Sequence, residues 1–201
     1  MTKIYKQNQI EELSKILNNN GVISYPTDTV YGICGKIEKQ VYDKLVKIKK
    51  RPSNKAFPIM CSDLNQIKQI AYTNEKIEKI IKKFMPGPIT LILKKKENIQ
   101  DYISNGKDTI AVRMAPSKNL QELIKKINSP IFMTSANISN EPVCKNIEEI
   151  EQKLKKLDAI VEGKVQYKEA STIVDCSKEK IEILREGPIK YEDIKNIENG
   201  D

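Results

Sequence analysis

A chain of 201 residues, with 39% hydrophobic and 31% charged residues, has the composition of a soluble globular protein and can bury one sizeable core. The formal net charge of +8 suits polyanions such as RNA or nucleotides, but it also simply aids solubility. The chain has no histidine, which excludes Ser-His and Cys-His nucleophilic machinery and every histidine-based metal site.

The cysteines and the apolar runs indicate the cellular compartment in which the protein is expected. The cysteines are widely spaced and form no C-x-x-C pair, so we expect small buried thiols in a reducing compartment rather than a zinc site. No apolar run approaches the length of a membrane-spanning helix, and residues 1–13 lack the apolar core of a signal peptide. We therefore expect a cytoplasmic protein with no membrane partner. The four cysteines are Cys34, Cys61, Cys144 and Cys176.

Helical and strand patterns alternate along the chain. Helices are indicated by apolar residues three and four positions apart, and strands by short apolar runs between turn residues. Gly21, Pro52 and the MPGP sequence at 85–88 mark ends, and Ser117 is expected to be an N-cap. In chain order we expect a helix at Asn8–Asn19, strands at Gly21–Tyr25 and 56–62 around a helix at Glu38–Lys50, helices at Asp63–Ala71 and Asn74–Phe84, strands at Ile89–Lys94 and Thr109–Met114, a helix at Ser117–Asn128, a strand at Pro130–Met133, a helix at Ile147–Lys156, strands at 158–163, 171–177 and 180–187, and a short final helix.

This alternation, without a long linker, low-complexity tract or internal repeat, predicts one α/β domain spanning residues 1–201. Its expected form is a twisted open sheet with helices on its faces. In such sheets, ligands tend to bind at the ends of strands. Short polar segments gather at these predicted ends: PTDT at 26–29, RPSNK at 51–55, TSAN at 134–137, EASTI at 169–173 and REGP at 185–188.

The segment SYPTDTVYG at 24–32 runs from a predicted strand into proline, threonines, an aspartate and a glycine. These residues are common in an ordinary turn. Small hydroxyl side chains and a glycine at a strand end also let a ligand approach the backbone closely. The segment alone leaves both interpretations open.

Arginine is used sparingly: of 35 basic residues, three are arginines, namely Arg51, Arg113 and Arg185. Arginine offers a planar fork of donors that grips carboxylate or phosphate through two bonds, which lysine cannot copy. Arg113 lies within an apolar strand-like run, where it needs a partner. Chance placement or a structural salt bridge is the alternative, but we expect the three arginines to line an anion site.

Two polar segments admit a structural and a functional interpretation each. Lys49 and Arg51 lie at the end of a predicted helix, where the helix macrodipole favours cations. Alternatively, they form a phosphate clamp. The TSAN segment, Thr134–Asn137, is either a capping turn or a polar cradle for phosphate oxygens or a hydrated metal ion. No Walker A, Rossmann or kinase motif is present, and Gly32–Lys36 (GICGK) is too short for a phosphate loop.

Seven segments, which include the polar segments described above, occur in the order typical of one family. They are YPTDTVYGICG, KKRPSNKAFPIM, MPGPITLIL, TIAVRMAP, TSANIS, ASTIVD and ILREGP, and they extend from about Gly21 to Pro188. In this respect the chain resembles the YrdC-like threonylcarbamoyl-AMP synthases in their short form, without an extra C-terminal domain. The resemblance implies a fold similar to that of dihydroxybutanone phosphate synthase.

The resemblance also implies a reaction. Enzymes of this family convert L-threonine, bicarbonate and ATP, with Mg²⁺, to threonylcarbamoyl-AMP and pyrophosphate. The adenylate is then used by downstream threonylcarbamoyl-transferase proteins to modify an adenosine (position 37) next to the anticodon of tRNA. Members also tend to bind double-stranded RNA or tRNA, with which the net charge is compatible.

Site residues follow from the resemblance position by position. The Lys-x-Arg and Ser-x-Asn pairs that mark the active branch fall on Lys49 and Arg51 and on Ser135 and Asn137, and they imply catalytic and nucleotide-binding roles. The threonine contacts are implied at Thr29, Arg113 and Ser171, and further nucleotide contacts at Thr109 and Arg185. In this interpretation SYPTDTVYG forms the floor of the threonine pocket, where Gly32 allows close approach and Pro26 fixes the turn.

The chain departs from the family at three positions. Met60 stands where longer relatives have a histidine near the threonine, and Lys55 stands where they have an asparagine that touches ATP. After TSAN, Asn140 replaces a glycine, and asparagine tolerates the same left-handed conformation.

The implied chemistry needs no histidine. A carbamate formed from the threonine amine and bicarbonate is already an anionic nucleophile, so the protein mainly aligns reactants and neutralises charge. We expect no dedicated protein base and no protein metal site, with Mg²⁺ carried mainly by the nucleotide phosphates. Three alternatives stay open: an RNA-binding module without catalysis, another adenylating or carbamoyl-transferring enzyme, and the related non-synthase branch, which lacks the four-residue set.

Overall fold

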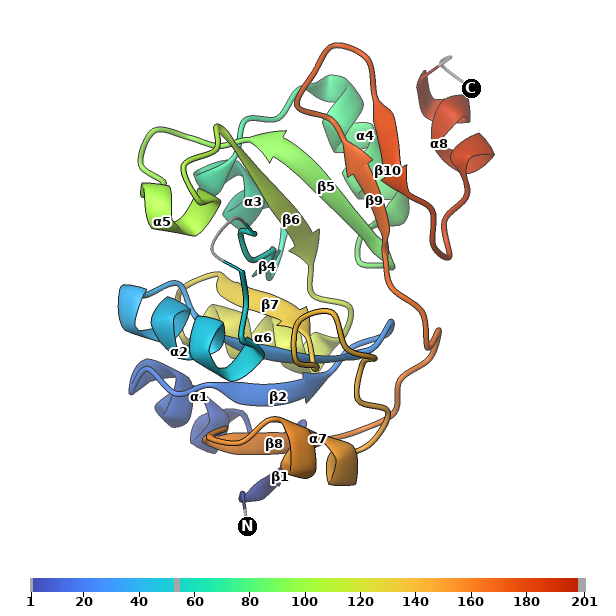
Figure 1. Ribbon diagram of the computed structural model, residues 1–201. Coiled ribbons are helices and arrows are strands. Elements are labelled where there is room, and N and C mark those ends of the chain that lie inside the picture. Colours follow the sequence, from blue (N-terminus) through green and yellow to red (C-terminus); the bar gives the residue numbers. More distant parts are fainter. Residues whose placement is uncertain (1, 53–54, 199–201) are drawn as a thin grey trace.

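A computed structural model describes residues 2–52 and 55–198 and shows a mixed sheet of ten strands with helices on both faces (Figure 1). The strands are β1 (Ile4–Lys6), β2 (Ile23–Pro26), β3 (Tyr31–Lys36), β4 (Ile59–Cys61), β5 (Ile89–Lys94), β6 (Thr109–Met114), β7 (Ile131–Ser135), β8 (Ala159–Glu162), β9 (Thr172–Asp175) and β10 (Glu182–Arg185). The helices are α1 (Ile10–Asn18), α2 (Lys39–Lys49), α3 (Leu64–Ile70), α4 (Glu75–Phe84), α5 (Asp101–Ser104), α6 (Lys118–Lys126), α7 (Ile147–Lys153) and α8 (Tyr191–Glu198).

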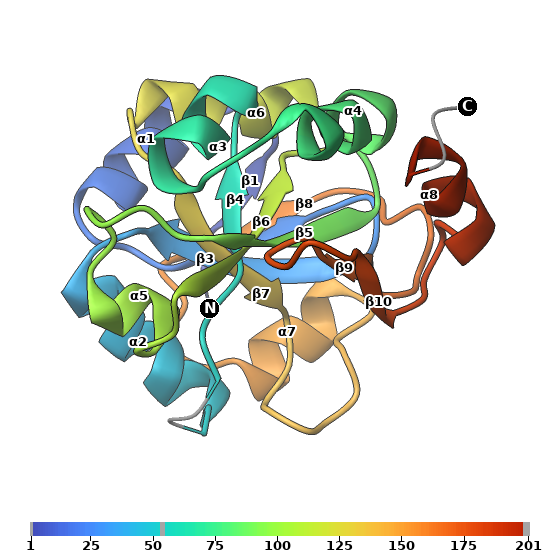
Figure 2. The same ribbon diagram turned by 90° about the horizontal axis from the view of Figure 1, so that it is seen from above.

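The strand order is β1-β8-β2-β3-β7-β4-β6-β5-β9-β10. The sheet combines parallel pairs, such as β4 with β6 and β5 with β9, with antiparallel pairs, such as β3 with β7. Helices α1, α3, α4 and α6 cover one face, and α2, α5 and α7 cover the other (Figure 2). The prediction of an α/β domain with an open sheet and helices on its faces is thus confirmed.

Apolar periodicity accounts for the helices, and polar caps account for several of their starts. The side chains of Asp63, Asn74, Ser117 and Asn146 each accept a hydrogen bond from the backbone three residues on, which satisfies one free N–H of the first turn. The expected N-cap at Ser117 is therefore confirmed. The buried sides of α1 and α6 form one apolar cluster with β2, β7 and β8, and the other helices pack into a second cluster.

Three elements were not expected from the sequence: β1, β3 and α5. Strand β3 contains Gly32 and Gly35, and glycine weakens strand patterns. Both glycines are needed for packing, because a Cβ at Gly32 would lie 2.4 Å from Met133 Sδ and one at Gly35 would lie 2.5 Å from a Val41 methyl group. The strand forms because β2 and β7 pair with it from either side.

One connection crosses most of the sheet. The chain leaves β8 near one edge and enters β9 seven strand spacings away, through residues 163–171. The connection runs along one side of the molecule in Figure 1.

No helix in the described part of the chain is both long and apolar enough to cross a membrane.

Candidate functional site

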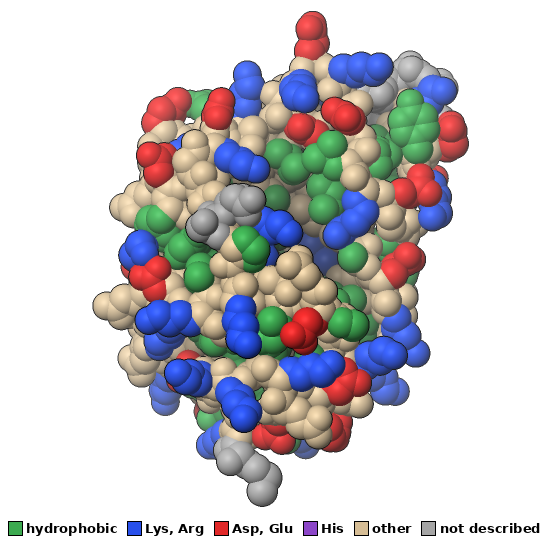
Figure 3. Space-filling view, viewed as in Figure 1, with side chains coloured by type: hydrophobic (Ala, Val, Ile, Leu, Met, Phe, Trp, Pro, Cys, Tyr) green, Lys and Arg blue, Asp and Glu red, His purple; other side chains and the backbone are tan. Residues whose placement is uncertain are grey.

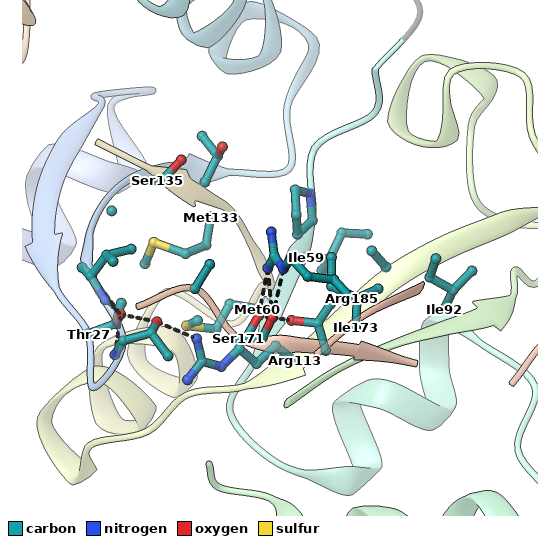
Figure 4. A pocket seen from close by; sticks show the side chains of 18 of the residues that line it. Thr27, Ile59, Met60, Ile92, Arg113, Met133, Ser135, Ser171, Ile173 and Arg185 are labelled. Carbon is teal, nitrogen blue, oxygen red and sulfur yellow. Dashed lines mark hydrogen bonds between the residues drawn. The ribbon is translucent and has the colours of Figure 1, made fainter. Parts of the chain in front are cut away.

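A cavity of about 320 Å³ opens over the middle of the sheet. Figure 3 shows the hollow on this face, with hydrophobic side chains and Lys or Arg side chains around it. Its walls come from the β2–β3 loop and from β3, β4, β5, β6, β7, β9 and β10, so residues far apart in sequence meet there (Figure 4). The polar segments expected at strand ends thus contribute side chains to this one cavity.

All three arginines line this cavity. Arg51 arrives from the end of α2, Arg113 from β6 and Arg185 from the end of β10. Three guanidinium groups around one cavity make a strongly anion-attracting site, since each remains protonated at neutral pH. Their placement around one cavity agrees with the expectation, drawn from the sparing use of arginine, that the three residues gather at one site.

Arg113 is 6% exposed, and its guanidinium is held by three groups. Nε donates to the backbone oxygen of Gly87 at 3.0 Å, and NH1 donates to Thr29 Oγ1 at 2.9 Å. NH2 forms an ion pair with the carboxylate of Asp28. Burial lowers the pKa of Arg113 and the carboxylate of Asp28 opposes this shift, so the charge is retained. Asp28 is the partner that an arginine in an apolar strand requires.

The β2–β3 loop is organised by the hydroxyl of Thr27. Its Oγ1 donates to the backbone oxygen of Val30 at 2.6 Å and accepts from the backbone N–H of Val30 at 3.2 Å. It also lies 3.0 Å from Thr29 Oγ1, which in turn accepts from Arg113. This chain of polar groups points Thr29 and Arg113 into the cavity together. The SYPTDTVYG segment is therefore both a tight turn and a wall of the site.

A second polar cluster lies across β5, β9 and β10. The hydroxyl groups of Thr90 and Ser171 are 2.8 Å apart and buried. Arg185 donates to the backbone oxygen of Ser171 through Nε at 3.0 Å and NH2 at 2.7 Å. Figure 4 shows Ser171 between Arg113 and Arg185. Arg185 is thus bonded to the same residue whose hydroxyl meets Thr90.

Lys49 is buried beneath the turn that ends β7. Its Nζ donates to Ser135 O at 2.6 Å, Asn137 O at 2.9 Å and Asn137 Oδ1 at 2.8 Å. Three acceptors match the three N–H donors of an ammonium group. Ser135 Oγ donates to the same Asn137 Oδ1 at 2.8 Å, and Asn137 Nδ2 donates to Glu141 O at 2.7 Å. Burial, and next the charge of Arg51, lower the pKa of Lys49 to about 7.

Arg51 leaves α2 in the direction of the cavity, two residues after Lys49. Nε donates to Lys55 O at 2.8 Å and NH2 donates to Ala56 O at 2.6 Å. The guanidinium lies over the ring of Phe57, 4.5 Å from its centre. The Lys-x-Arg pair is thus divided: Lys49 holds the turn from below, and Arg51 borders the cavity itself.

The sequence-predicted residues fall into three positions. Thr29, Arg51, Arg113, Ser135, Ser171 and Arg185 line the cavity. Lys49 and Asn137 support it from behind through the contacts above. Thr109 does not line the cavity. It is the first residue of β6 and lies on the same face of the strand as Ala111 and Arg113, four residues before Arg113.

The departures from the family also have definite places. Met60 lines the cavity and is paired with Arg113 in the register of β4 and β6. Lys55 is exposed, and its backbone oxygen accepts from Arg51. Asn140 has φ of 69°, the left-handed conformation that its substitution for glycine led us to expect.

Sequence reasoning missed four residues that build the site: Thr27, Asp28, Thr90 and Met133. Thr27 and Asp28 stand in the quoted motif, but only the fold shows that they hold Thr29 and Arg113. Thr90 alternates with apolar residues on β5, and no local signal distinguishes it from an ordinary strand threonine. In the sequence Met133 cannot be distinguished from an ordinary core methionine. Only the fold shows that its side chain packs against Gly32 at the cavity.

Among the described residues, no group of three or more His, Cys, Asp or Glu side chains could hold a metal ion. The polar groups around the cavity are hydroxyls and guanidinium groups. Such a set fits a magnesium ion that arrives on phosphate oxygens and keeps much of its water, with oxygen atoms such as Ser135 Oγ on the protein side.

Comparison with known proteins identifies a family and similar proteins. The Sua5/YciO/YrdC family, whose description reads "Telomere recombination", matches residues 15–187. A protein of Methanocaldococcus jannaschii named "Putative threonylcarbamoyl-AMP synthase" is 38% identical over 196 residues, covering 93% of this chain and 92% of that protein.

Solved structures agree with this relationship. P. abyssi Sua5 complexed with L-threonine matches with a TM-score of 0.89 and 27% identity, over 98% of this chain and 60% of that chain. This chain therefore spans about three fifths of Sua5. E. coli YciO matches with a TM-score of 0.87 and 25% identity, over 96% of this chain and 100% of that chain.

Proposed function

The chain belongs to the Sua5/YciO/YrdC family, and we propose that it is an L-threonylcarbamoyladenylate synthase, a nucleotidyltransferase. In this proposal it converts L-threonine, bicarbonate and ATP to threonylcarbamoyl-AMP and pyrophosphate. Two relatives support it: the M. jannaschii protein bears the name of this synthase, and Sua5 has been crystallised with L-threonine.

The observation that carries the proposal is the composition of the cavity. Arg113, Thr29 and Ser171 offer a carboxylate grip and hydroxyls suited to an amino acid with a hydroxyl group. Arg51, Ser135 and Arg185 border the same cavity and suit phosphate oxygens. A cavity that takes both anions side by side can bring a carbamoylated amino acid to the α-phosphorus of a nucleotide.

The chemistry begins with threonine and bicarbonate. The threonine ammonium and bicarbonate condense to the carbamate, releasing water and one proton to solvent. A carbamate oxygen then attacks the α-phosphorus of ATP, and the bond from that phosphorus to the bridging oxygen of pyrophosphate breaks. No other co-reactant is required, and no protein group has to accept the proton.

The protein's part is orientation and charge neutralisation. Arg113 and Thr29 would hold the threonine carboxylate, and Arg51 and Arg185 would stabilise the phosphates. Ser135 would orient phosphate oxygens while Lys49 and Asn137 keep its turn in place. Thr109 stays a predicted nucleotide contact, reached only by a nucleotide that extends along β6 beyond Ala111.

Mg²⁺ belongs to this proposal as the companion of ATP. Carried by phosphate oxygens, with Ser135 Oγ on the protein side and Asn137 holding that side chain in place, it would supply further charge neutralisation at the leaving pyrophosphate when bound.

The product places the protein at the first step of tRNA modification. We propose that threonylcarbamoyl-AMP passes to transferase proteins that modify the adenosine at position 37. The net charge of +8 suits contact with double-stranded RNA or tRNA. Affinity that falls steeply with salt and without sequence preference would identify such contact as electrostatic.

Pyrophosphate release tests the proposal directly. The assay contains ATP, bicarbonate and Mg²⁺, with or without L-threonine, and compares the wild-type protein with Arg51→Ala. Release that needs both threonine and bicarbonate and fails in the variant supports the synthase. Folded protein that binds RNA but releases no threonine-dependent pyrophosphate would rule the enzyme out and leave a binding module.

A further inference from the structure

Asp28 connects three parts of the molecule that lie far apart in the sequence. Its carboxylate pairs with NH2 of Arg113, 85 positions later. Its backbone oxygen accepts two hydrogen bonds, from Gln166 N at 3.1 Å and Tyr167 N at 2.8 Å. The next residue, Thr29, lines the cavity. One residue thus touches the carboxylate-gripping arginine, the cavity wall and the crossing connection.

The carboxylate of Asp28 limits how the guanidinium of Arg113 can turn. A guanidinium has five N–H donors, and three of those on Arg113 are engaged, one each with Gly87, Thr29 and Asp28. The two others sit on different terminal nitrogens, NH1 and NH2. A ligand carboxylate that binds these N–H groups meets them in a defined direction only if the plane of the guanidinium is held.

The backbone of Asp28 holds residues 163–170, which we call the crossing segment. Most of its side chains are exposed, and Val165 is the one that packs on the core. Its anchors are few: the two hydrogen bonds to Asp28, and the hydroxyl of Tyr31, which donates to Gly163 O at 2.7 Å and accepts from Gly163 N at 3.3 Å. Its last residue, Ala170, lines the cavity. A segment with so few buried contacts opens easily unless these anchors hold.

We propose that Asp28 is a positioning residue for the site: its carboxylate sets the plane of Arg113 for a substrate carboxylate, and its backbone holds the crossing segment against the rim of the same cavity. The proposal rests on the proposed function, because it takes threonine as the ligand of Arg113. It predicts that the grip on the carboxylate and the closure of the rim change together.

Two substitutions separate position from charge. Asp28→Asn removes the charge but keeps an oxygen that can accept the bond from NH2. Asp28→Ala removes the acceptor and frees the guanidinium to turn. The matched control is Asp43→Ala, which removes an exposed carboxylate paired with Lys39 on α2. Urea unfolding of each variant establishes that it is folded under the assay conditions.

The first measurement is calorimetric binding of L-threonine and of L-threoninamide, which lacks the carboxylate. We expect Asp28→Ala to raise the threonine Kd at least about tenfold and to reduce the preference for threonine over its amide by about fivefold. Asp28→Asn should stay within about threefold of wild type, and ATP binding should change little in either variant. A merely structural role would weaken both amino-acid ligands equally.

The second measurement is trypsin cleavage after Lys164 and Lys168, both exposed on the crossing segment. Saturating threonine should slow these cleavages in wild type and in Asp28→Asn, in which the side chain still ties the residue to Arg113. The protection should be lost in Asp28→Ala, which keeps the backbone oxygen but no longer connects it to the threonine-binding arginine. Cleavage after Lys178, exposed on the β9–β10 connection, reports on the rest of the fold and should not respond.

The outcomes are distinguishable. Wild-type protein that binds no threonine overturns the proposed function. Threonine binding that is equal or tighter in both Asp28 variants overturns the positioning role, since Asp28 then only competes with the substrate for Arg113. Threonine binding without protection of Lys164 and Lys168 overturns the link to the crossing segment.

Discussion

The Nζ atom of Lys49 lies 2.8 Å from Oδ1 of Asn137, so a buried ammonium on α2 holds the turn that follows β7. The same Oδ1 accepts from Ser135 Oγ, which borders the cavity. Lys49 therefore reaches the site through Asn137 and Ser135, whereas Arg51 reaches it directly. This division of the Lys-x-Arg pair leads to separate expectations for its two members.

Replacing Lys49 by methionine should disrupt the turn. Three oxygen atoms would lose a donor, and each buried unsatisfied group costs about 1–3 kcal/mol. We expect the unfolding free energy to fall by about 2–4 kcal/mol and kcat for pyrophosphate release to fall at least about 100-fold, with threonine affinity changed less than about threefold. Urea unfolding and steady-state kinetics measure both, with the exposed Lys47→Met as control. A variant with wild-type kcat would show that the turn positions itself without the ammonium.

The stability contributed by Lys49 should depend on pH. Burial lowers its folded pKa to about 7, whereas an unfolded lysine keeps its proton to about pH 10.4. Between these values the unfolded state binds more protons, so the unfolding free energy rises with pH by up to about 1.4 kcal/mol per unit. The wild-type protein should therefore gain stability relative to Lys49→Met between about pH 7 and pH 9, as measured by urea unfolding. A constant difference across that range would mean that the ammonium keeps its proton in the fold.

Replacing Arg113 by lysine should impair threonine binding selectively. Lysine carries the charge but cannot meet Gly87, Thr29, Asp28 and a substrate carboxylate at once. We expect the threonine Kd to rise about 10- to 100-fold while ATP affinity stays within about threefold. Calorimetry with each ligand tests this. Equal losses for the two ligands would point to a general collapse of the cavity.

Replacing Arg51 by lysine should have the opposite selectivity. The guanidinium is stacked on Phe57 and bonded to Lys55 O and Ala56 O, and lysine reproduces neither the stacking nor the fork. We expect kcat for pyrophosphate release to fall about 10- to 100-fold, with the threonine Kd within about threefold of wild type. If threonine binding fell as much as turnover, the assignment of Arg51 to the phosphates would be wrong.

Gly32→Ala should fill part of the cavity. The added Cβ would lie 2.4 Å from Met133 Sδ and 3.1 Å from Thr134 O, so the Met133 side chain has to move. Since both residues line the cavity, we expect about a five- to tenfold loss of threonine affinity and a destabilisation of about 1–3 kcal/mol. Gly106→Ala is the control, because nothing lies within 4 Å of its Cβ position, although its φ of 73° carries a modest strain. Unchanged threonine affinity in Gly32→Ala would place the ligand away from Met133.

Much of the architecture was predictable because it is recorded locally. The apolar spacing of α1, α2 and α6 reflects the face that each buries, and the caps at Asp63 and Ser117 act within one turn. Strand β3 was not predictable by the same means. Its glycines look like turn residues, and only the close approach of Met133 and Val41 shows why glycine is required.

The polar segments at strand ends, the sparing use of arginine and the family could all be recognised in the sequence. The fold was needed to show that Arg113 pairs with Asp28, that Lys49 lies behind the cavity while Arg51 borders it, and that residues 163–170 are held by Asp28. The physical reason is the distance along the chain over which each kind of interaction acts. Periodicity and capping act over a few residues, whereas these partners meet only after the mixed sheet has brought distant strands together and buried charges have found counter-charges and acceptors.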